Sequence, residues 1–218
     1  MIVVIVGMHR SGTSALAGLL HHNGIVMGEE ENFRPKPKKN QNEKGYYENF
    51  RFRSLNDELL GYNNYKAKSF DPYVPDFKFP EELKHEGQNL LHEYSIRYKN
   101  WGWKDPRTSL TLKFWLDLYP NVKVVISRRD YEKIAQSMWA RKNSGSVKKY
   151  IDLCTAYYGS IHTAAYKTDW CNVSFDNLCT NPEFEANKLA RFLDHPITDL
   201  SFIEDKLRHH KEQNNETT

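Results

Sequence analysis

Apolar residues in this chain fall into short runs and into longer stripes that repeat at helical spacing. The first run, Ile2–Val6, is continuous and β-branched, which is typical of a strand buried on both faces of a parallel sheet. Four later runs predict further short strands, at Gly24–Gly28, Trp101–Lys104, Val122–Ser127 and Cys171–Phe175. Helical stripes lie between them, at residues 15–20, 52–59, 80–100, 110–118, 131–141, 146–166 and 182–193.

This alternation predicts an α/β fold: a single domain with a doubly wound, mostly parallel sheet of about five strands. The domain is expected to span residues 1–208, and the polar residues 209–218 are expected to form a disordered tail. Residues 61–79 are irregular and rich in aromatic side chains, so we expect them to pack over a pocket. Residues 29–44 are expected to form a surface loop that orders over a ligand, and they contain Lys36, Lys38, Lys39 and Lys44.

Length and composition limit the function classes. A chain of 218 residues is long enough for one domain but too short for two independent enzyme domains. The formal net charge of +3 lacks the basic excess of a nucleic-acid coat, and a mean hydropathy of -0.76 excludes a membrane protein. The three cysteines, Cys154, Cys171 and Cys179, contain no C-x-x-C pair, which argues against a disulfide framework or a zinc ribbon. The apolar start is too short for a signal segment, so we expect a cytoplasmic protein that binds neither nucleic acid nor membrane.

The segment Gly7–Ser14 joins the first predicted strand to the first predicted helix. Backbone N–H groups in such a loop, together with the positive end of the helix dipole, can cradle a phosphate. Both glycines and the final hydroxyl fit the nucleotide-binding pattern G-x-x-x-x-G-K-S/T, but Thr13 stands where that pattern has lysine. This argues against a nucleoside triphosphatase. Arg10 supplies a cation that could contact the bridging oxygen of a 5′-phosphate; the alternative is an ordinary tight turn with a surface arginine.

This loop resembles the 5′-phosphosulfate loop of the sulfotransferase superfamily, and the whole string resembles the bacterial-type branch of that family. The resemblance implies that the loop holds the 5′-phosphate of 3′-phosphoadenosine 5′-phosphosulfate (PAPS), through His9, Arg10, Ser11, Gly12, Thr13 and Ser14.

A second match lies at Lys123–Asp130 and Ser137. It resembles the family's 3′-phosphate site, which has an arginine at a strand end and a serine eight residues later, a spacing that Arg129 fits and Arg128 does not. A strand end and the second turn of the next helix can converge on one phosphate. The alternative is a salt-bridged surface arginine beside a helix-surface serine.

A third match, Lys104–Arg107, resembles the K-D-P segment of the tyrosylprotein branch and the lysine strand of cytosolic members. By this resemblance, Lys104 neutralises the bridging oxygen and the transferring sulfonate; the simpler alternative is that Asp105 pairs with Arg107 at a turn. Residues 173–193 resemble the family's late strand, turn and helix, to which we assign no chemistry. The likeness extends from residue 1 to about 195, but no equivalent of the family's C-terminal G-x-x-G-x-K/R segment is visible.

Sulfonate transfer also needs a group that accepts the proton of the acceptor hydroxyl. No histidine matches the base of cytosolic members, so two carboxylates compete. Glu48 opens a predicted helix in a segment that resembles one of the bacterial-type branch, although it could serve only as a helix cap. Glu30 resembles the second glutamate of the tyrosylprotein G-E-E, which is the base there. We favour Glu48 because the run Glu29–Glu31 is expected to be solvated. Asn56 and Asp57, on the helix predicted at residues 52–59, are further candidates for residues of the pocket.

The sequence therefore predicts an enzyme that moves a sulfonate from PAPS to a hydroxyl group without a metal, leaving 3′-phosphoadenosine 5′-phosphate (PAP). The loop lysines and the aromatic residues of 62–79 favour a sugar or another small hydroxyl compound as acceptor. Two alternatives stay open. One is a nucleotide or small-molecule kinase with a degenerate loop, in which Asp105 would hold Mg²⁺. The other is a binding module that keeps the nucleotide pocket but not turnover.

Overall fold

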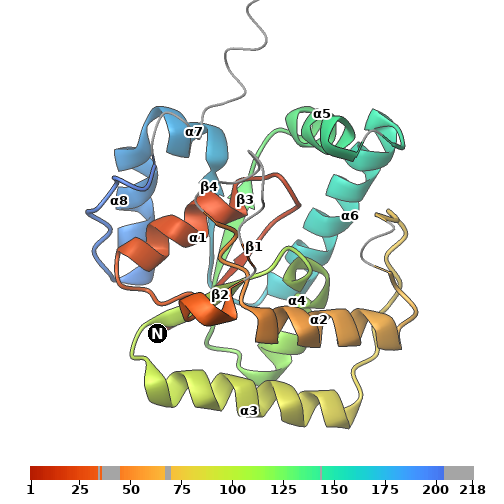
Figure 1. The fold of residues 1–218 in the computed structure, drawn as a ribbon, viewed down its shortest axis with the longest axis horizontal. Helices are drawn as coiled ribbons and strands as arrows, with labels where there is room; N and C mark the ends of the chain where they lie inside the picture. Colours follow the sequence, from red (N-terminus) through yellow and green to blue (C-terminus); the bar gives the residue numbers. More distant parts are fainter. Residues whose placement is uncertain (34, 36–44, 67–69, 143, 204–218) are drawn as a thin grey trace, which may run out of the picture.

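A four-stranded parallel sheet forms the centre of the protein (Figure 1). The computed structural model describes residues 1–33, 35, 45–66, 70–142 and 144–203. Its strands are β1 (Ile2–Val6), β2 (Trp101–Lys104), β3 (Lys123–Arg128) and β4 (Trp170–Ser174), in the order β2-β1-β3-β4. The predicted α/β class with a parallel sheet is confirmed.

Helices connect the strands and cover both faces of the sheet. Figure 1 shows α1, α7 and α8 on one side and α4, α5 and α6 on the other. Within the described residues, the helices are α1 (Thr13–His22), the 3-10 turn η1 (Glu30–Asn32), α2 (Phe50–Tyr62), α3 (Glu81–Arg97), α4 (Thr108–Leu118), α5 (Tyr131–Lys142), α6 (Val147–Ala165), α7 (Phe175–Thr180) and α8 (Pro182–Leu193).

The alternating side chains of β1 build a core on each face of the sheet. Val3 and Ile5 pack with apolar residues of α1 and α8. Val4 and Val6 pack in the larger core, which includes residues from α2 to α6 and aromatic side chains of β2. Every residue of β1 is buried, which explains the unbroken run of β-branched residues in its sequence.

The prediction of a strand at Gly24–Gly28 is wrong. Because no strand forms there, the sheet has four strands rather than about five. Only Val26 forms a bridge there, to Trp101 at the start of β2. Its N–H donates to the carbonyl of Asn100, and its own carbonyl accepts from the N–H of Gly102. Gly24 and Gly28 have positive φ angles of 82° and 135°, so the chain turns on either side of Val26 before a strand can develop.

The other predicted elements are present with small changes of boundary. The last strand ends at Ser174, because the Ser174 hydroxyl accepts from the N–H of Asn177 and thereby begins the short helix α7, which the sequence did not predict. Helix α3 ends at Arg97 rather than near residue 100. Two predictions lie outside the described residues: the four loop lysines, and the boundary between residues 208 and 209. None of the helices described here is long and apolar enough to cross a membrane.

Candidate active site

The carboxyl edge of the sheet gathers the predicted site residues. The loop Gly7–Gly12 leaves β1 at this edge, Lys104 ends β2, and Arg129 directly follows β3. The carboxyl ends of parallel strands meet at one edge, which is where open α/β sheets bind ligands.

The loop has a backbone that requires glycine. Gly12 has a φ of 94°, and a Cβ atom there would lie 2.1 Å from the ring of Phe175. Gly7 is fixed by Ser109 from the first turn of α4. The Gly7 N–H donates to the Ser109 hydroxyl at 2.9 Å, and the Gly7 carbonyl accepts from the same hydroxyl at 3.0 Å. Gly12 is the N-cap of α1 and offers no side-chain cap. The first N–H groups of α1 therefore remain available to an anion.

The small side chains of the loop have two different environments. Ser11 is fully buried, donates its hydroxyl to the carbonyl of Met8 at 2.7 Å, and has its own carbonyl bound by the Ser127 hydroxyl at 2.7 Å. Thr13 is also buried, at the start of α1. Ser14 is half-buried and accepts a hydrogen bond from Lys104 Nζ at 3.3 Å. Among these three side chains, the Ser14 hydroxyl is therefore the one that contacts Lys104, another predicted site residue.

Arg10, Ser137 and Arg129 form one cluster, which we call the arginine cluster. Arg10 Nε donates to the Ser137 hydroxyl at 2.9 Å, and Arg129 Nη1 donates to the carbonyl of Arg10 at 3.1 Å. Burial lowers the pKa of Arg10, and the charges of Arg141 and Arg129 lower it further. Arg129 Nε is buried with no hydrogen-bond partner among the described residues. Several cations and an unsatisfied donor in one place favour a bound anion.

Arg141 is a member of this environment that the sequence analysis missed. It follows Ser137 by four residues on α5, so both lie on the same face of that helix. That spacing is the signal that could have found it. Arg128, by contrast, is held elsewhere: it donates to Asn172, contacts His162 and lies over the ring of Tyr158.

Lys104, Glu48 and Ser14 form a second cluster, which we call the lysine cluster. The Lys104 side chain is fully buried, and its Nζ lies 3.3 Å from Glu48 Oε1. Trp103 faces the aromatic core, where its ring stacks on Phe52, and alternation along β2 directs Lys104 away from that core. Glu48 is 6% exposed and directly precedes Asn49, the N-cap of α2. The structure thus brings together the favoured base and the lysine.

Glu30 is exposed on η1, where its charge acts on His21 and Tyr47. The expectation that the whole run Glu29–Glu31 is solvated is wrong for Glu29. Glu29 is mostly buried and accepts hydrogen bonds from Asn32, Tyr94, Tyr98 and Arg97.

His9 lies on the side of the loop that faces the irregular segment. Its ring packs against Phe70 and Tyr157, with centroid separations of 5.4 and 5.9 Å. Burial, assisted by the charge of Arg107, lowers the pKa of His9 to about 3, so the imidazole is neutral. Its Nε2 atom is buried and has no hydrogen-bond partner among the residues described. This nitrogen is available to a bound molecule.

Asp105 is fully buried and fully engaged by the protein. It forms an ion pair with Arg107 at 2.8 Å and accepts from Asn56 at 3.0 Å. Arg107 also pairs with Asp57 at 2.7 Å, and Asn56 accepts from Thr111 and Trp115. Burial raises the pKa of Asp105 despite the opposing charge of Arg107. The pairing with Arg107 at a turn is the simpler alternative raised by the sequence, and it occupies the carboxylate that a kinase would use for Mg²⁺.

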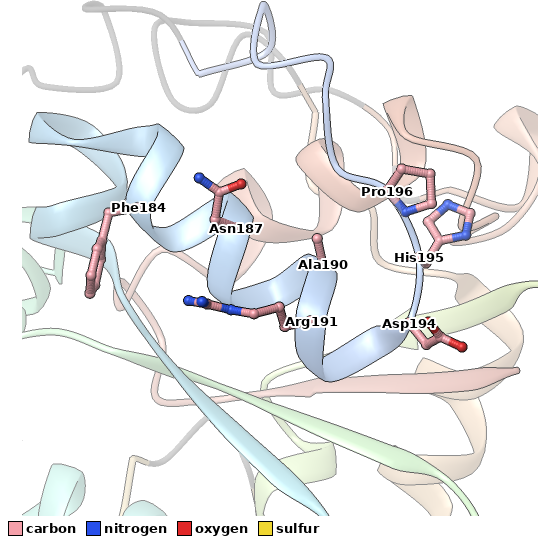
Figure 2. A pocket seen from close by; sticks show the side chains of 7 residues that line it. All are labelled: Phe184, Asn187, Ala190, Arg191, Asp194, His195 and Pro196. Atoms are coloured by element: carbon pink, nitrogen blue, oxygen red, sulfur yellow. The ribbon is translucent and has the colours of Figure 1, made fainter.

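A hollow of about 590 Å³ lies elsewhere on the molecule, along α8 and the turn after it (Figure 2). Its lining residues are Phe184, Asn187, Ala190, Arg191, Asp194, His195 and Pro196. None of the predicted site residues is among them. Within the described residues, no group of three or more His, Cys, Asp or Glu side chains is placed to hold a metal ion.

A family model described as the sulfotransferase family matches residues 3–199, nearly the whole described chain. The chain belongs to the sulfotransferase family. Similarity to solved structures agrees with this assignment at the level of the fold. The sulfotransferase domain from the curacin biosynthetic pathway superposes with a TM-score of 0.57 at 14% identity, covering 91% of this chain and 75% of that one.

Two further sulfotransferases show the same likeness. The domain of the olefin synthase from Synechococcus PCC 7002 has a TM-score of 0.57 at 13% identity and covers 98% of this chain and 82% of that one. A sulfotransferase from Mycobacterium tuberculosis has a TM-score of 0.51 at 17% identity and covers 92% and 69%, respectively. No curated protein gives a significant match.

Proposed function

We propose that this sulfotransferase-family protein transfers a sulfonate from PAPS to the hydroxyl group of a small molecule or carbohydrate. The observation that carries the proposal is the pair of clusters at one sheet edge. The arginine cluster and the lysine cluster are joined by the loop Gly7–Ser14, and each combines a cation with a serine hydroxyl. PAPS carries two separate anionic ends, a 3′-phosphate and a 5′-phosphosulfate, which need two such sites.

The residues at this edge fit such a donor. Loop glycines let the backbone approach a phosphate closely, since a Cβ at Gly12 would be blocked by Phe175. In our proposal Arg129 and Ser137 bind the 3′-phosphate, with Arg129 Nε supplying a donor that the described protein leaves unpaired, while Arg10, predicted for the 5′-phosphate, links the loop to this site through Ser137. Arg141 adds a positive charge beside this cluster. The loop N–H groups and Ser14 bind the 5′-phosphosulfate.

The lysine cluster would carry the chemistry. The acceptor oxygen forms a bond to sulfur while the bond between sulfur and the 5′-phosphate oxygen breaks. The Glu48 carboxylate takes the proton of the acceptor hydroxyl, and the ammonium of Lys104 stabilises the charge that develops on the departing phosphate oxygen. The direct contact between these two groups, at 3.3 Å, places both at one point of the site, where a sulfonate and an acceptor hydroxyl could approach them together. The sulfonated acceptor and PAP are the products.

The acceptor would bind beside His9. The neutral imidazole, with its unpaired Nε2, offers a hydrogen bond, and the partly buried Phe70 beside it offers apolar ring surface. A polar atom beside an aromatic ring suits a hydroxyl on a ring-shaped molecule, such as a sugar or a phenol.

Ligand-dependent melting tests the donor. PAPS and PAP should each raise the melting temperature, because a ligand that binds only the native state stabilises it by mass action, while ATP with Mg²⁺ should do much less. A larger shift with ATP and Mg²⁺ would support the kinase alternative instead. A panel of sugars, phenols and alcohols is then screened with ³⁵S-labelled PAPS, and turnover should survive EDTA. Stabilisation by PAP without transfer of label to any acceptor would indicate a binding module.

A further inference from the structure

We propose that Tyr94, held by Glu29, is a positioning residue that fixes Glu48 through Asn49. This inference rests on the proposed role of Glu48 as the base. It assigns a function to Glu29, which directly precedes Glu30, the other candidate for the base.

Glu29 is the anchor of this network. Tyr94 and Tyr98, both from α3 or its end, donate to its carboxylate at 2.9 and 2.8 Å, and Asn32 donates at 3.0 Å. Arg97 adds an ion pair at 3.1 Å. Burial alone would raise the pKa of Glu29, but the hydrogen bonds from Asn32, Tyr98 and Tyr94 outweigh it and hold the pKa at about 2. Glu29 is therefore a permanent acceptor at physiological pH.

Tyr94 connects Glu29 to Asn49 by hydrogen bonds. The hydroxyl that donates to Glu29 also accepts from Asn49 Nδ2, at 2.6 Å. Burial raises the pKa of Tyr94 to about 12, so the hydroxyl keeps the proton that this arrangement requires. Asn49 is fully buried, and its Oδ1 accepts from the N–H of Arg51 as the N-cap of α2. Both ends of the Asn49 amide are thus fixed.

The backbone on the other side of Glu48 is fixed as well. Tyr47 has a φ of 50°, which is uncommon for a residue other than glycine and persists only where the surroundings enforce it. Its ring packs against His21, Phe33 and Phe202. Glu48 therefore lies between two immobilised neighbours, one of which, Asn49, is bound through its side-chain amide by the Tyr94 hydroxyl.

This immobilisation matters because a base must reach the acceptor proton within hydrogen-bond distance. Glu48 is surrounded by charged or titratable groups from two elements: Lys104, Asp105 and Arg107 from β2 and the turn after it, and His9 from the loop. A small displacement changes its distance to Lys104 and its direction toward the acceptor. Misplacement of a reacting group by about 1 Å can lower a rate by about 10²-fold.

Two tyrosines of equal chemistry provide a matched pair of variants. Tyr94→Phe removes the hydroxyl that joins Glu29 to Asn49, whereas Tyr98→Phe removes a hydroxyl that binds Glu29 alone. Asn49→Ser is a second route to the same break, since serine still caps α2 but its shorter side chain falls short of the Tyr94 hydroxyl. All three variants are first checked for folding by thermal melting.

The first readout needs no ligand. The titration of the Glu48 carboxyl is followed by ¹³C NMR, with its signal assigned from Glu48→Gln. Tyr94→Phe and Asn49→Ser should move this titration to higher pH, because the carboxylate loses its fixed contact with Lys104, while Tyr98→Phe should leave it at the wild-type value. The same titration in all four proteins would overturn the inference.

The second readout is the hydrolysis of ³⁵S-labelled PAPS, in which water serves as the acceptor. Tyr94→Phe should lower kcat about tenfold with an unchanged KM for PAPS, and the combination with Asn49→Ser should be no worse than either single change. Equal losses in Tyr94→Phe and Tyr98→Phe would show a general effect on the fold and would overturn the inference. If the wild-type protein neither binds PAP nor consumes PAPS, the proposed function fails, and the Glu48 titration alone decides the positioning.

Discussion

Replacing Glu48 by glutamine tests the assignment of the base. The substitution keeps the size of the side chain and an oxygen that can accept from Lys104, but the amide cannot take up a proton. Because Glu48 is 6% exposed and packed beside a fully buried lysine, a change of size at this position would confuse loss of the base with loss of packing.

The structure sets the expected magnitudes. General-base catalysis contributes about 10²–10⁴-fold, so turnover should fall by at least about 10²-fold. Removing one partner of a buried ion pair costs about 3–5 kcal/mol, but the glutamine oxygen keeps one hydrogen bond to Lys104, so the free energy of unfolding should fall by only about 1–2 kcal/mol. PAP binds mainly through the arginine cluster in our proposal, so its affinity should stay near the wild-type value.

The assay combines three measurements: turnover with ³⁵S-labelled PAPS, PAP affinity by calorimetry, and urea unfolding. Glu30→Gln is the matched control, since it makes the same chemical change at an exposed carboxylate on η1. It should leave all three quantities nearly unchanged.

Two results would refute the reasoning. If Glu30→Gln is inactive and Glu48→Gln is active, the chain uses the carboxylate that resembles the tyrosylprotein pattern. If both variants keep their activity, the base is another group, and Asp57 would be the next to test, because its side chain is partly exposed whereas that of Asp105 is fully buried.

Three further outcomes are expected. Arg129→Ala should weaken PAP at least about tenfold but leave adenosine 5′-monophosphate, which lacks the 3′-phosphate, little changed; Arg128→Ala is the control, and equal losses for both nucleotides would contradict the assignment. Gly12→Ala should lower the free energy of unfolding by about 2–4 kcal/mol in urea titrations, because it adds a clash with Phe175 at 2.1 Å to an unfavourable φ of 94°. Glu29 has a folded-state pKa of about 2, so its stabilisation is complete above its unfolded pKa of about 4.3 and is lost as the pH falls toward 2. The stability difference between wild type and Glu29→Gln should therefore shrink over that interval, and a constant difference would contradict this account.

Local patterns in the sequence were sufficient for most of the fold. β1 and α1 were predicted because an unbroken β-branched run and a glycine loop are local signals. The segment around Val26 has a local tendency to extend, but a strand also needs a partner, and Trp101 offers it only a single bridge.

In the candidate site too, residues that belong to local patterns were predictable, whereas contacts between distant segments were not. Glycine positions and the spacing from Arg129 to Ser137 are local, so the sequence could single out these residues. The environment of Glu29 was not predictable, since Tyr94 and Tyr98 are 65 and 69 residues away in the chain. No local pattern distinguishes a glutamate bound by two distant tyrosines from the exposed Glu30 beside it.

The central place of β1 has a consequence for how the protein is made. Its register partners begin at Trp101 and Lys123, so about one hundred residues must be synthesised before β1 can pair with anything. Until then, an apolar β-branched segment with two open edges is exposed to association with other chains. The loop that follows it is equally incomplete, because Ser109, which holds both polar groups of Gly7, is 102 residues away. A fragment ending before β2 would contain the whole glycine loop yet lack the groups that shape it. The proposed nucleotide binding should therefore emerge only with the complete sheet and report on completed folding.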